Sequence, residues 1–330
     1  MRFKSVISKQ NLSILNGIVL ALEKISNNAV IFLSPDHMRI ALVTDNIDLP
    51  KAFVELRQDI MFAEYHIESL NDNNLLLKIN LNNFSNALAS GKNANQSVMK
   101  LVKRGETPCL CIETKAKESL GVDITHDIPI SVLRCSEIVH YQPPNVPPPR
   151  VSLEIGRNKL FRTVIERMQK LSKYLYFQAF QAGKIILSID HVSNSTIKTH
   201  FTGLVPRFRG GTLSRQRDDT NEAMVKCDIR KLSATLHFQS HYPWSAAIAH
   251  VSNNEILVLN VELTPSDLGN VTYFVPVIIM NDFEAGEEEE AEETEEAEEA
   301  EDHGQNGGHD DEYGGASAGS YADQDHSCNY

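Results

Sequence analysis

The chain repeats one local pattern four times, and this repetition constrains the fold more than any single motif does. In each copy a short alternating strand leads into an amphipathic helix, and further alternating strands follow. The helices are predicted to begin near residues 11, 82, 158 and 228, so that successive starts are 71, 76 and 70 residues apart. The two halves are offset by 147 and 146 residues, which indicates an internal duplication. Such halves predict an α+β fold with helices packed on one face of the sheets.

The clearest helix is predicted over residues 158–175, NKLFRTVIERMQKLSKYL. At about 100° per residue, the apolar side contains Leu160, Phe161, Val164, Ile165, Met168 and Leu171. The opposite side contains Lys159, Arg162, Gln169, Lys170 and Lys173, with Glu166 as the one acid. Because a solvated face usually mixes both signs, this face belongs either to an ordinary surface helix or to a helix that contacts an anion.

The other three helices are predicted with less charge on their outer faces. Asn11 is expected to cap the first, which runs to about Ile25. The predicted inward residues are Leu15, Ile18, Leu22 and Ile25, then Leu81, Phe84 and Leu88, then Ile229, Leu232 and Leu236. The predicted outward residues are Ser13, Asn16, Gly17 and Lys24, then Asn86 and Ser90, then Arg230, Lys231 and His237. The cationic faces therefore belong mainly to the second half.

The formal net charge of −13 describes one end of the chain. From residue 283 onward there are 18 Asp and Glu and no Lys or Arg, so residues 1–282 hold 31 basic and 26 acidic side chains, a net of +5. Residues 283–330 have almost no large apolar side chains and are predicted to form a disordered acidic tail. A solubilising spacer is the simpler interpretation, and a DNA mimic or histone-binding segment is the alternative.

A proline-rich segment separates the two halves. Residues 134–150 interrupt the strand pattern, and QPPNVPPP within them is typical of an extended, semi-rigid connector. A proline-rich ligand for another domain is the alternative interpretation. The predicted organisation is a first domain over 1–133, a connector over 134–150, a second domain over 151–282 and the tail over 283–330.

The sequence gives little support for catalysis, a metal site or a membrane segment. Cys109 and Cys111 lack further ligands at fitting spacing, so reduced cysteines of a cytosolic or nuclear protein are expected. His126 and Asp127 are adjacent on a strand and point to opposite faces, so they do not form an acid–base pair easily. We find no catalytic or phosphate-loop motif, no apolar leader and no run of about 18 apolar residues. A non-catalytic protein without cofactor or metal is expected.

Four similar helices on one side of curved sheets are typical of a surface that follows a phosphate backbone. Attraction to phosphates works through counterion release and does not depend on base sequence, so scattered Lys and Arg suffice. No recognition helix, zinc-finger spacing or aromatic RNA-binding motif is present, so base reading is not expected.

Five short segments resemble those of one protein family. They are M-R-F-K at 1–4, S-P-D at 34–36, T-H-D-I-P-I at 125–130, D-I-R-K-L at 228–232 and Y-F-V-P at 273–276. Their order and spacing, together with the duplication, make residues 1–282 resemble the Hus-type subunit of the nine-one-one checkpoint clamp, a heterotrimer related to PCNA. The acidic tail departs from the family pattern, which usually ends soon after the last of these segments.

The resemblance implies a PCNA-like DNA clamp fold, with two similar domains, each of two strand–helix–strands units, sheets outside and helices inside. It implies a non-catalytic, cofactor-free subunit of a ring that encircles duplex DNA at damage sites or stalled forks and supports checkpoint kinase activation and repair. The implied partners are two other clamp subunits, a checkpoint-specific clamp loader, duplex DNA and repair enzymes. Localisation in the nucleus, besides any cytoplasmic pool, is implied. The alternatives are a homotrimeric PCNA-type replication clamp and a DNA-free adaptor scaffold.

Carried onto the helix faces, the resemblance implies that eight cations contact DNA. They are Lys24, Lys92, Lys159, Arg162, Lys170, Lys173, Arg230 and Lys231. The second helix has Asn86 and Ser90 where a cation would be expected, so most phosphate contacts of this subunit are predicted in its second half.

The resemblance also implies that neighbouring subunits pair through edge strands near Thr125–Leu133 and near Asn194–Thr202. Pro129 supports this, because proline removes a ladder donor and is tolerated on an edge strand. Pairing of edges between chains is ordinary β-augmentation. The connector matches the loop under which partner peptides bind in PCNA-like clamps, with Tyr141 and the prolines as candidate walls, and a plain linker is the alternative.

Overall fold

The structure is a computed structural model, and the expected tail 283–330 lies outside the part that it describes. The described residues are 1–42, 46, 48–115, 123–157, 159–191, 195–207 and 221–279. All of them belong to one unit, Met1–Met280.

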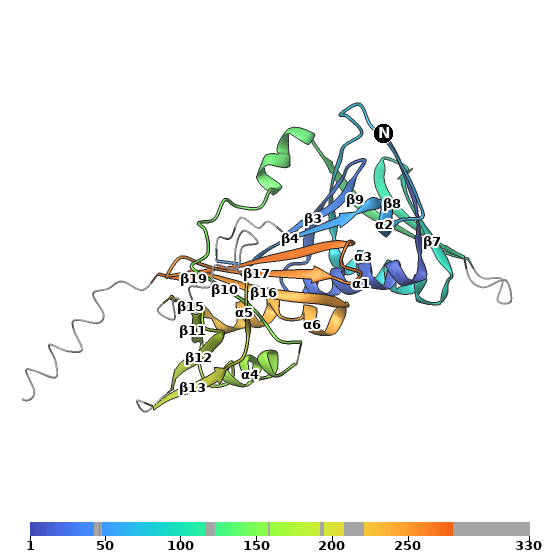
Figure 1. Cartoon of the computed structure of the whole chain (residues 1–330). Helices are drawn as coiled ribbons and strands as arrows, with labels where there is room; N and C mark the ends of the chain where they lie inside the picture. The colour runs from blue at the N-terminus through green and yellow to red at the C-terminus, as the bar shows by residue number, and fades with distance from the viewer. Residues whose placement is uncertain are drawn as a thin grey trace, which may run out of the picture. The chain divides into compact units, whose positions relative to one another are not determined.

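The first half contains two long helices and a run of antiparallel strands (Figure 1). Its strands are β1 (Arg2–Ser8), β2 (Asn28–Leu33), β3 (His37–Leu42), β4 (Lys51–Arg57), β5 (Glu64–Glu68), β6 (Leu75–Asn80), β7 (Gln96–Arg104), β8 (Thr107–Lys115) and β9 (Asp123–Leu133). Its helices are α1 (Lys9–Glu23), α2 (Gln58–Met61), α3 (Leu81–Ser90) and the 3₁₀ helix η1 (Gly91–Asn93). A second 3₁₀ helix, η2 (Cys135–Tyr141), precedes the extended proline-rich connector.

The second half repeats this order. Its strands are β10 (Val151–Glu154), β11 (Tyr174–Phe180), β12 (Lys184–His191), β13 (Ser195–Phe201), β14 (Val205–Pro206), β15 (Glu222–Asp228), β16 (Trp244–Ser252), β17 (Ile256–Leu263), β18 (Gly269–Val275) and β19 (Val277–Ile278). Its helices are α4 (Leu160–Met168), α5 (Ile229–Thr235) and α6 (Phe238–His241). The strand pairings β2–β3–β4 and β6–β2 of the first half recur as β11–β12–β13 and β15–β11, as a duplication predicts.

One antiparallel pair of strands joins the halves. β4 pairs with β18, from Gly269 opposite Leu56 to Phe274 opposite Lys51, and makes the larger sheet continuous across both halves. That sheet has 14 strands, and the second sheet has 5, in the order β13-β12-β11-β15-β19. Gly269 is required here, because a Cβ on it would lie 1.9 Å from the carbonyl oxygen of Glu55.

The copies of these two strands keep an open edge. By the duplication, β13 corresponds to β4 and β9 corresponds to β18. Within the described residues, β13 pairs only with β12, and residues 123–129 of β9 pair only with β8. Residues 130–133 of β9 pair with β6, so the edge expected over Thr125–Leu133 is open only in its first part.

The helices pack against the buried face of the sheets, as the periodicity predicted. Leu15, Ile18 and Leu22 of α1 are fully buried, and Phe84 of α3 is buried in the same core. The predicted cap of α1 is wrong, because the hydroxyl of Ser8 accepts the hydrogen bond from the backbone N–H of Asn11. Asn11 instead donates its side-chain amide to the carbonyl oxygens of Ile60 and Met61.

The helix predicted over residues 158–175 is shorter than expected. It ends at Met168, because Leu175 belongs to β11 and is buried there in the period-two pattern of a strand. Phe161, Ile165 and Met168 form its buried face, whereas Leu160 is 60% and Leu171 45% exposed. No helix among the described residues is long and apolar enough to cross a membrane.

Candidate nucleic-acid interface

Helix α4 presents cations at both of its ends. Lys159 directly precedes the first turn and is exposed, and Lys170 is exposed in the turn after the last. Arg167 in the last turn is exposed as well, although it is not among the eight cations predicted to contact DNA. The reason is that the helix turns its buried face toward Phe161 rather than Leu160, which moves Arg167 to the solvent side.

Arg162 differs from the other cations of α4, because it is already engaged. Its Nε donates to Oε1 of Glu166 at 2.6 Å, and its Nη1 donates to Oγ of Ser240 in α6 at 2.9 Å. Its side chain is only 18% exposed. Arg162 therefore links α4 to α6 besides contributing positive charge to the surface.

A second group of cations gathers around the start of α5. Asp228 caps this helix by accepting from the backbone N–H groups of Arg230 and Lys231. The backbone N–H of Ile229 donates to the carbonyl of Lys173 at 3.0 Å, which brings Lys173 to the same helix end. Its ammonium lies 4.9 Å from the ring centre of Tyr174, and the hydrogen bond with that phenol raises the pKa of Lys173. Arg230 and Lys173 are exposed, and Lys231 is half-buried.

The first half supplies fewer cations, in agreement with the sequence. The outer face of α3 is built from amides, with Asn82 donating to Glu23 and Asn86 donating to Asn82. Lys92 is exposed in η1, which packs against α1. Lys24 is exposed at the end of α1.

Two histidines that were not predicted as binding residues lie close to Lys24 and Arg162. The rings of His237 and His241 are 6.0 Å apart, and both side chains are half-buried. Burial and the charge of Arg162 lower the pKa of His237 to about 4. Burial and the charge of Lys24 lower the pKa of His241. His237 was predicted to face outward. Helix α6 was not predicted, so the contact between α6 and α1 could not be foreseen.

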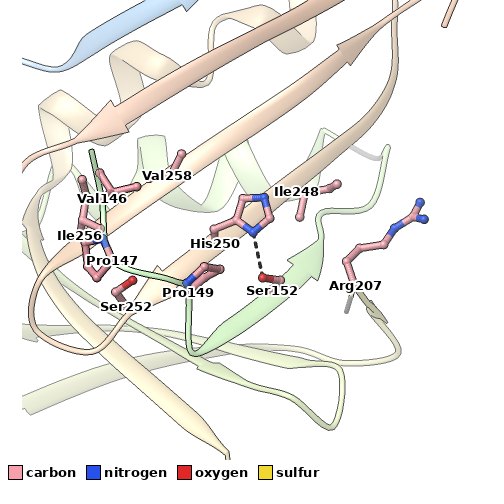
Figure 2. A pocket seen from close by; sticks show the side chains of 10 residues that line it. All are labelled: Val146, Pro147, Pro149, Ser152, Arg207, Ile248, His250, Ser252, Ile256 and Val258. Carbon is pink, nitrogen blue, oxygen red and sulfur yellow. Dashed lines mark hydrogen bonds between the residues drawn. The ribbon is translucent and has the colours of Figure 1, made fainter. Parts of the chain in front are cut away.

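The opposite face of the sheet carries a groove beneath the connector. A cavity of about 410 Å³ lies between the connector and strands β10, β16 and β17. Figure 2 shows Val146 and Pro149 of the connector beside this cavity. Oγ of Ser152 lies 2.8 Å from Nδ1 of His250, a contact that is drawn there as a dashed line. A second cavity, of about 460 Å³, is lined by Tyr141 and Pro143.

Asp127 and Cys111 were considered in the sequence as parts of an acid–base pair and of a metal site. Asp127 accepts from Nε of Arg104 at 2.7 Å, and this hydrogen bond lowers the pKa of the carboxyl group. Burial raises the pKa of Cys111 to about 11, so its thiol stays protonated at neutral pH. No group of three His, Cys, Asp or Glu side chains that could hold a metal ion occurs among the described residues.

The sequence is similar to that of a family of checkpoint proteins. The model of the family described as "Hus1-like protein" matches residues 1–279. The Dictyostelium discoideum "Checkpoint protein hus1 homolog" is 28% identical over 85% of this chain and 100% of its own length. The human "Checkpoint protein HUS1" is 28% identical over 77% of this chain and 91% of its own. The Schizosaccharomyces pombe "Checkpoint protein hus1" is 30% identical over 62% of this chain and 70% of its own.

The fold is similar to that of archaeal PCNA. The PCNA of Thermococcus kodakaraensis superposes with a TM-score of 0.61 at 16% sequence identity, covering 84% of this chain and 100% of that one. The PCNA of A. fulgidus, solved with the C-terminal region of FEN-1 bound, gives a TM-score of 0.60 at 15% identity, over 85% of this chain and 100% of that one. The fold is therefore the PCNA-like α+β clamp fold.

Proposed function

The chain belongs to the Hus1-like family of checkpoint proteins and is a clamp subunit, and from this premise we propose how it assembles and what it binds. It forms one third of a heterotrimeric ring that encircles duplex DNA at damage sites or stalled forks. A checkpoint-specific loader places the ring, which then supports checkpoint kinase activation and DNA repair in the nucleus. The subunit itself catalyses no reaction.

The proposed assembly rests on one observation: two strand edges are paired within the chain, and the corresponding edges of their copies are open. The first half uses β4, and the second half uses β18, to make a continuous sheet within the chain. Their copies, β13 and residues 123–129 of β9, have no second strand partner among the described residues. A strand edge left open in this way is suited to pair with another chain.

Both open edges carry an exposed isoleucine, which supports their role as interfaces. Ile124 in β9 is 37% exposed and Ile197 in β13 is 38% exposed. Burying the remaining apolar surface at about 25 cal/mol per Å² favours pairing, in addition to the new backbone hydrogen bonds. Because one edge lies in each half, a head-to-tail ring follows when similar subunits pair β9 with β13.

DNA is bound through the helix side of such a ring. The proposal assigns the phosphate contacts to the exposed cations at the ends of α4 and at the start of α5, with weaker contributions from Lys24 and Lys92. The amides of Asn82 and Asn86 on α3 offer hydrogen bonds but no charge. Binding is expected to be independent of base sequence and strongly dependent on salt.

Repair partners are proposed to bind on the other side, beneath the connector. The structure of A. fulgidus PCNA contains the C-terminal region of FEN-1. In this chain the apolar groove beside Val146 and Pro149 offers space for a partner peptide, with His250 and Ser152 as polar groups at its floor.

Assembly is tested by native mass spectrometry of the full chain produced together with its two partner subunits. We expect a complex with one copy of each subunit, and we expect Ile124→Asp or Ile197→Asp to release one neighbour each. Leu70→Asp, at a fully exposed leucine outside both edges, is the matched control and should leave the ring intact. A trimer of this chain alone would support the homotrimeric clamp instead. Intact rings with both edge variants would refute the proposed interfaces.

A further inference from the structure

The helices of the two halves meet where α1 contacts α6. A Cβ on Gly17 would lie 2.1 Å from the carbonyl oxygen of His241, so the two backbones nearly touch. Arg162 reaches the same place from α4 through its hydrogen bond to Ser240. We call Lys24, Arg162, His237 and His241 the junction cluster.

The junction cluster places two cations, each with an acid in its surroundings, beside two imidazoles. Arg162, His241 and Lys24 all lower the pKa of His237, and Glu166 raises it. Lys24 and Arg162 lower the pKa of His241, and Glu23 raises it. Glu166 is the ion-pair partner of Arg162 within the cluster, whereas Glu23 accepts from Asn82 and Ser85 outside it. Two fixed cations thus stand beside two imidazoles that are neutral at physiological pH.

The same contact contains buried polar atoms without partners. Oδ1 of Asn16 in α1, and both polar atoms of the Gln239 side chain in α6, are buried and make no hydrogen bond within the described part of the chain. Apolar packing would make this helix contact more stable. A contact between halves that keeps charge and unpaired polar groups is typical of a binding surface rather than of a structural joint.

We propose that the junction cluster binds one phosphate of the duplex backbone and that His237 and His241 take up protons when it does so. This inference rests on the proposed function, because the helix side must face DNA. Lys24 is exposed and both histidines are half-buried, so an anion can approach all three side chains. A phosphate there offsets the charge of Lys24, adds to the compensation that Glu166 gives Arg162, and accepts hydrogen bonds from the imidazole N–H groups.

The coupling between proton uptake and phosphate binding fixes the direction in which the affinity for DNA changes with pH. In the free protein the cations and burial keep the histidines neutral, and a bound phosphate raises the pKa of both. The complex therefore holds more protons than the free ring, so the affinity for DNA rises as the pH falls toward 6.5, the ordinary pKa of histidine. Each proton taken up changes the Kd by at most about tenfold per pH unit.

The test measures proton uptake by the assembled ring on binding a duplex, using calorimetry in buffers with different ionisation enthalpies. We expect proton uptake near pH 6.5 and a Kd that falls about threefold for each unit by which the pH is lowered in this range. The double variant His237→Gln with His241→Gln should lose the uptake and flatten the pH dependence. His66→Gln, at an exposed histidine of β5, is the control and should behave as the wild type.

A second measurement does not depend on DNA. In the isolated full chain, Lys24→Gln should raise the NMR-measured pKa of His237 and His241, because it removes one of the cations that lower both. A ring that binds duplex without proton uptake, or a double variant with unchanged uptake, would overturn the inference and leave the clamp function standing. A ring that binds no duplex at any pH would overturn the proposed function itself.

Discussion

Gly17 of α1 lies against the carbonyl oxygen of His241 in α6, and a Cβ at this position would be 2.1 Å from that oxygen. The contact fixes the distance between a helix of the first half and a helix of the second. Gly17→Ala should therefore separate α1 from α6 and lower the free energy of unfolding by about 1–3 kcal/mol, in spite of the better helix propensity of alanine. Urea unfolding of the full chain measures this effect.

Ser13→Ala is the control for that experiment, because Ser13 is exposed on the same helix. It should change the free energy of unfolding by no more than about 0.5 kcal/mol. Equal stability of Gly17→Ala and the wild type would show that the two helices can move apart without cost, and would contradict a tight contact between the halves.

Two buried tyrosines of the second half form a hydroxyl pair. The oxygens of Tyr242 and Tyr273 are 3.1 Å apart, and both side chains are almost fully buried. Burial raises the pKa of both phenols, so the pair stays protonated. Tyr273→Phe should cost about 1–3 kcal/mol in unfolding free energy, because it leaves the hydroxyl of Tyr242 buried without its partner.

A double-mutant cycle checks that reason. Tyr242→Phe together with Tyr273→Phe should cost less than the sum of the two single changes, since no polar atom then remains unpaired. If the two costs simply add in urea unfolding, the hydroxyls act independently and the explanation fails.

The fold could be predicted largely because the duplication and the helical periodicity describe local properties of the chain. The starts expected near residues 82 and 228 agree with Leu81 and Ile229 within one residue. The errors arose where tertiary contacts decide. Ser8 rather than Asn11 caps α1, because the amide of Asn11 is needed by the carbonyls at the end of α2.

The candidate site was predictable only as a list of charges. Lys159, Lys170 and Arg230 are exposed, as their places on the predicted outer faces indicated. Arg162 was also selected, but nothing in its spacing shows that Glu166 and Ser240 engage its guanidinium. The junction cluster could not be predicted at all, because it combines residues of both halves through a contact that no local pattern encodes.

Because the pKa of His237 is lowered in the folded chain, we expect the free energy of unfolding to depend on pH in mild acid. The folded chain holds this pKa near 4, whereas the unfolded chain has the ordinary value of 6.5. Between these values the unfolded state binds more protons, so the free energy of unfolding should decrease as the pH falls through this window. Thermal unfolding of His237→Gln across the same range should show a weaker dependence on pH. A wild-type stability that is constant from pH 6.5 down to about 4 would contradict the depressed pKa.

The strongest test of the helix side as the DNA surface is a charge reversal in the second half. Lys170 and Lys173 are both exposed after α4, where the proposal assigns phosphate contacts. In the assembled ring, Lys170→Glu with Lys173→Glu should weaken duplex binding and reduce the slope of log K against log salt by about 1 per lost contact. Binding isotherms between about 50 and about 200 mM salt measure both quantities.

The matched control reverses two lysines on strands whose neighbours face the core. Lys78 of β6 and Lys184 of β12 each precede a buried isoleucine, Ile79 and Ile185, and so point to the other face of their sheets. Lys78→Glu with Lys184→Glu changes the net charge equally, so any general loss of attraction appears in both variants. A weaker affinity with an unchanged slope in both would reflect net charge alone, whereas a smaller slope confined to Lys170 and Lys173 means that these two side chains release counterions from the DNA they touch.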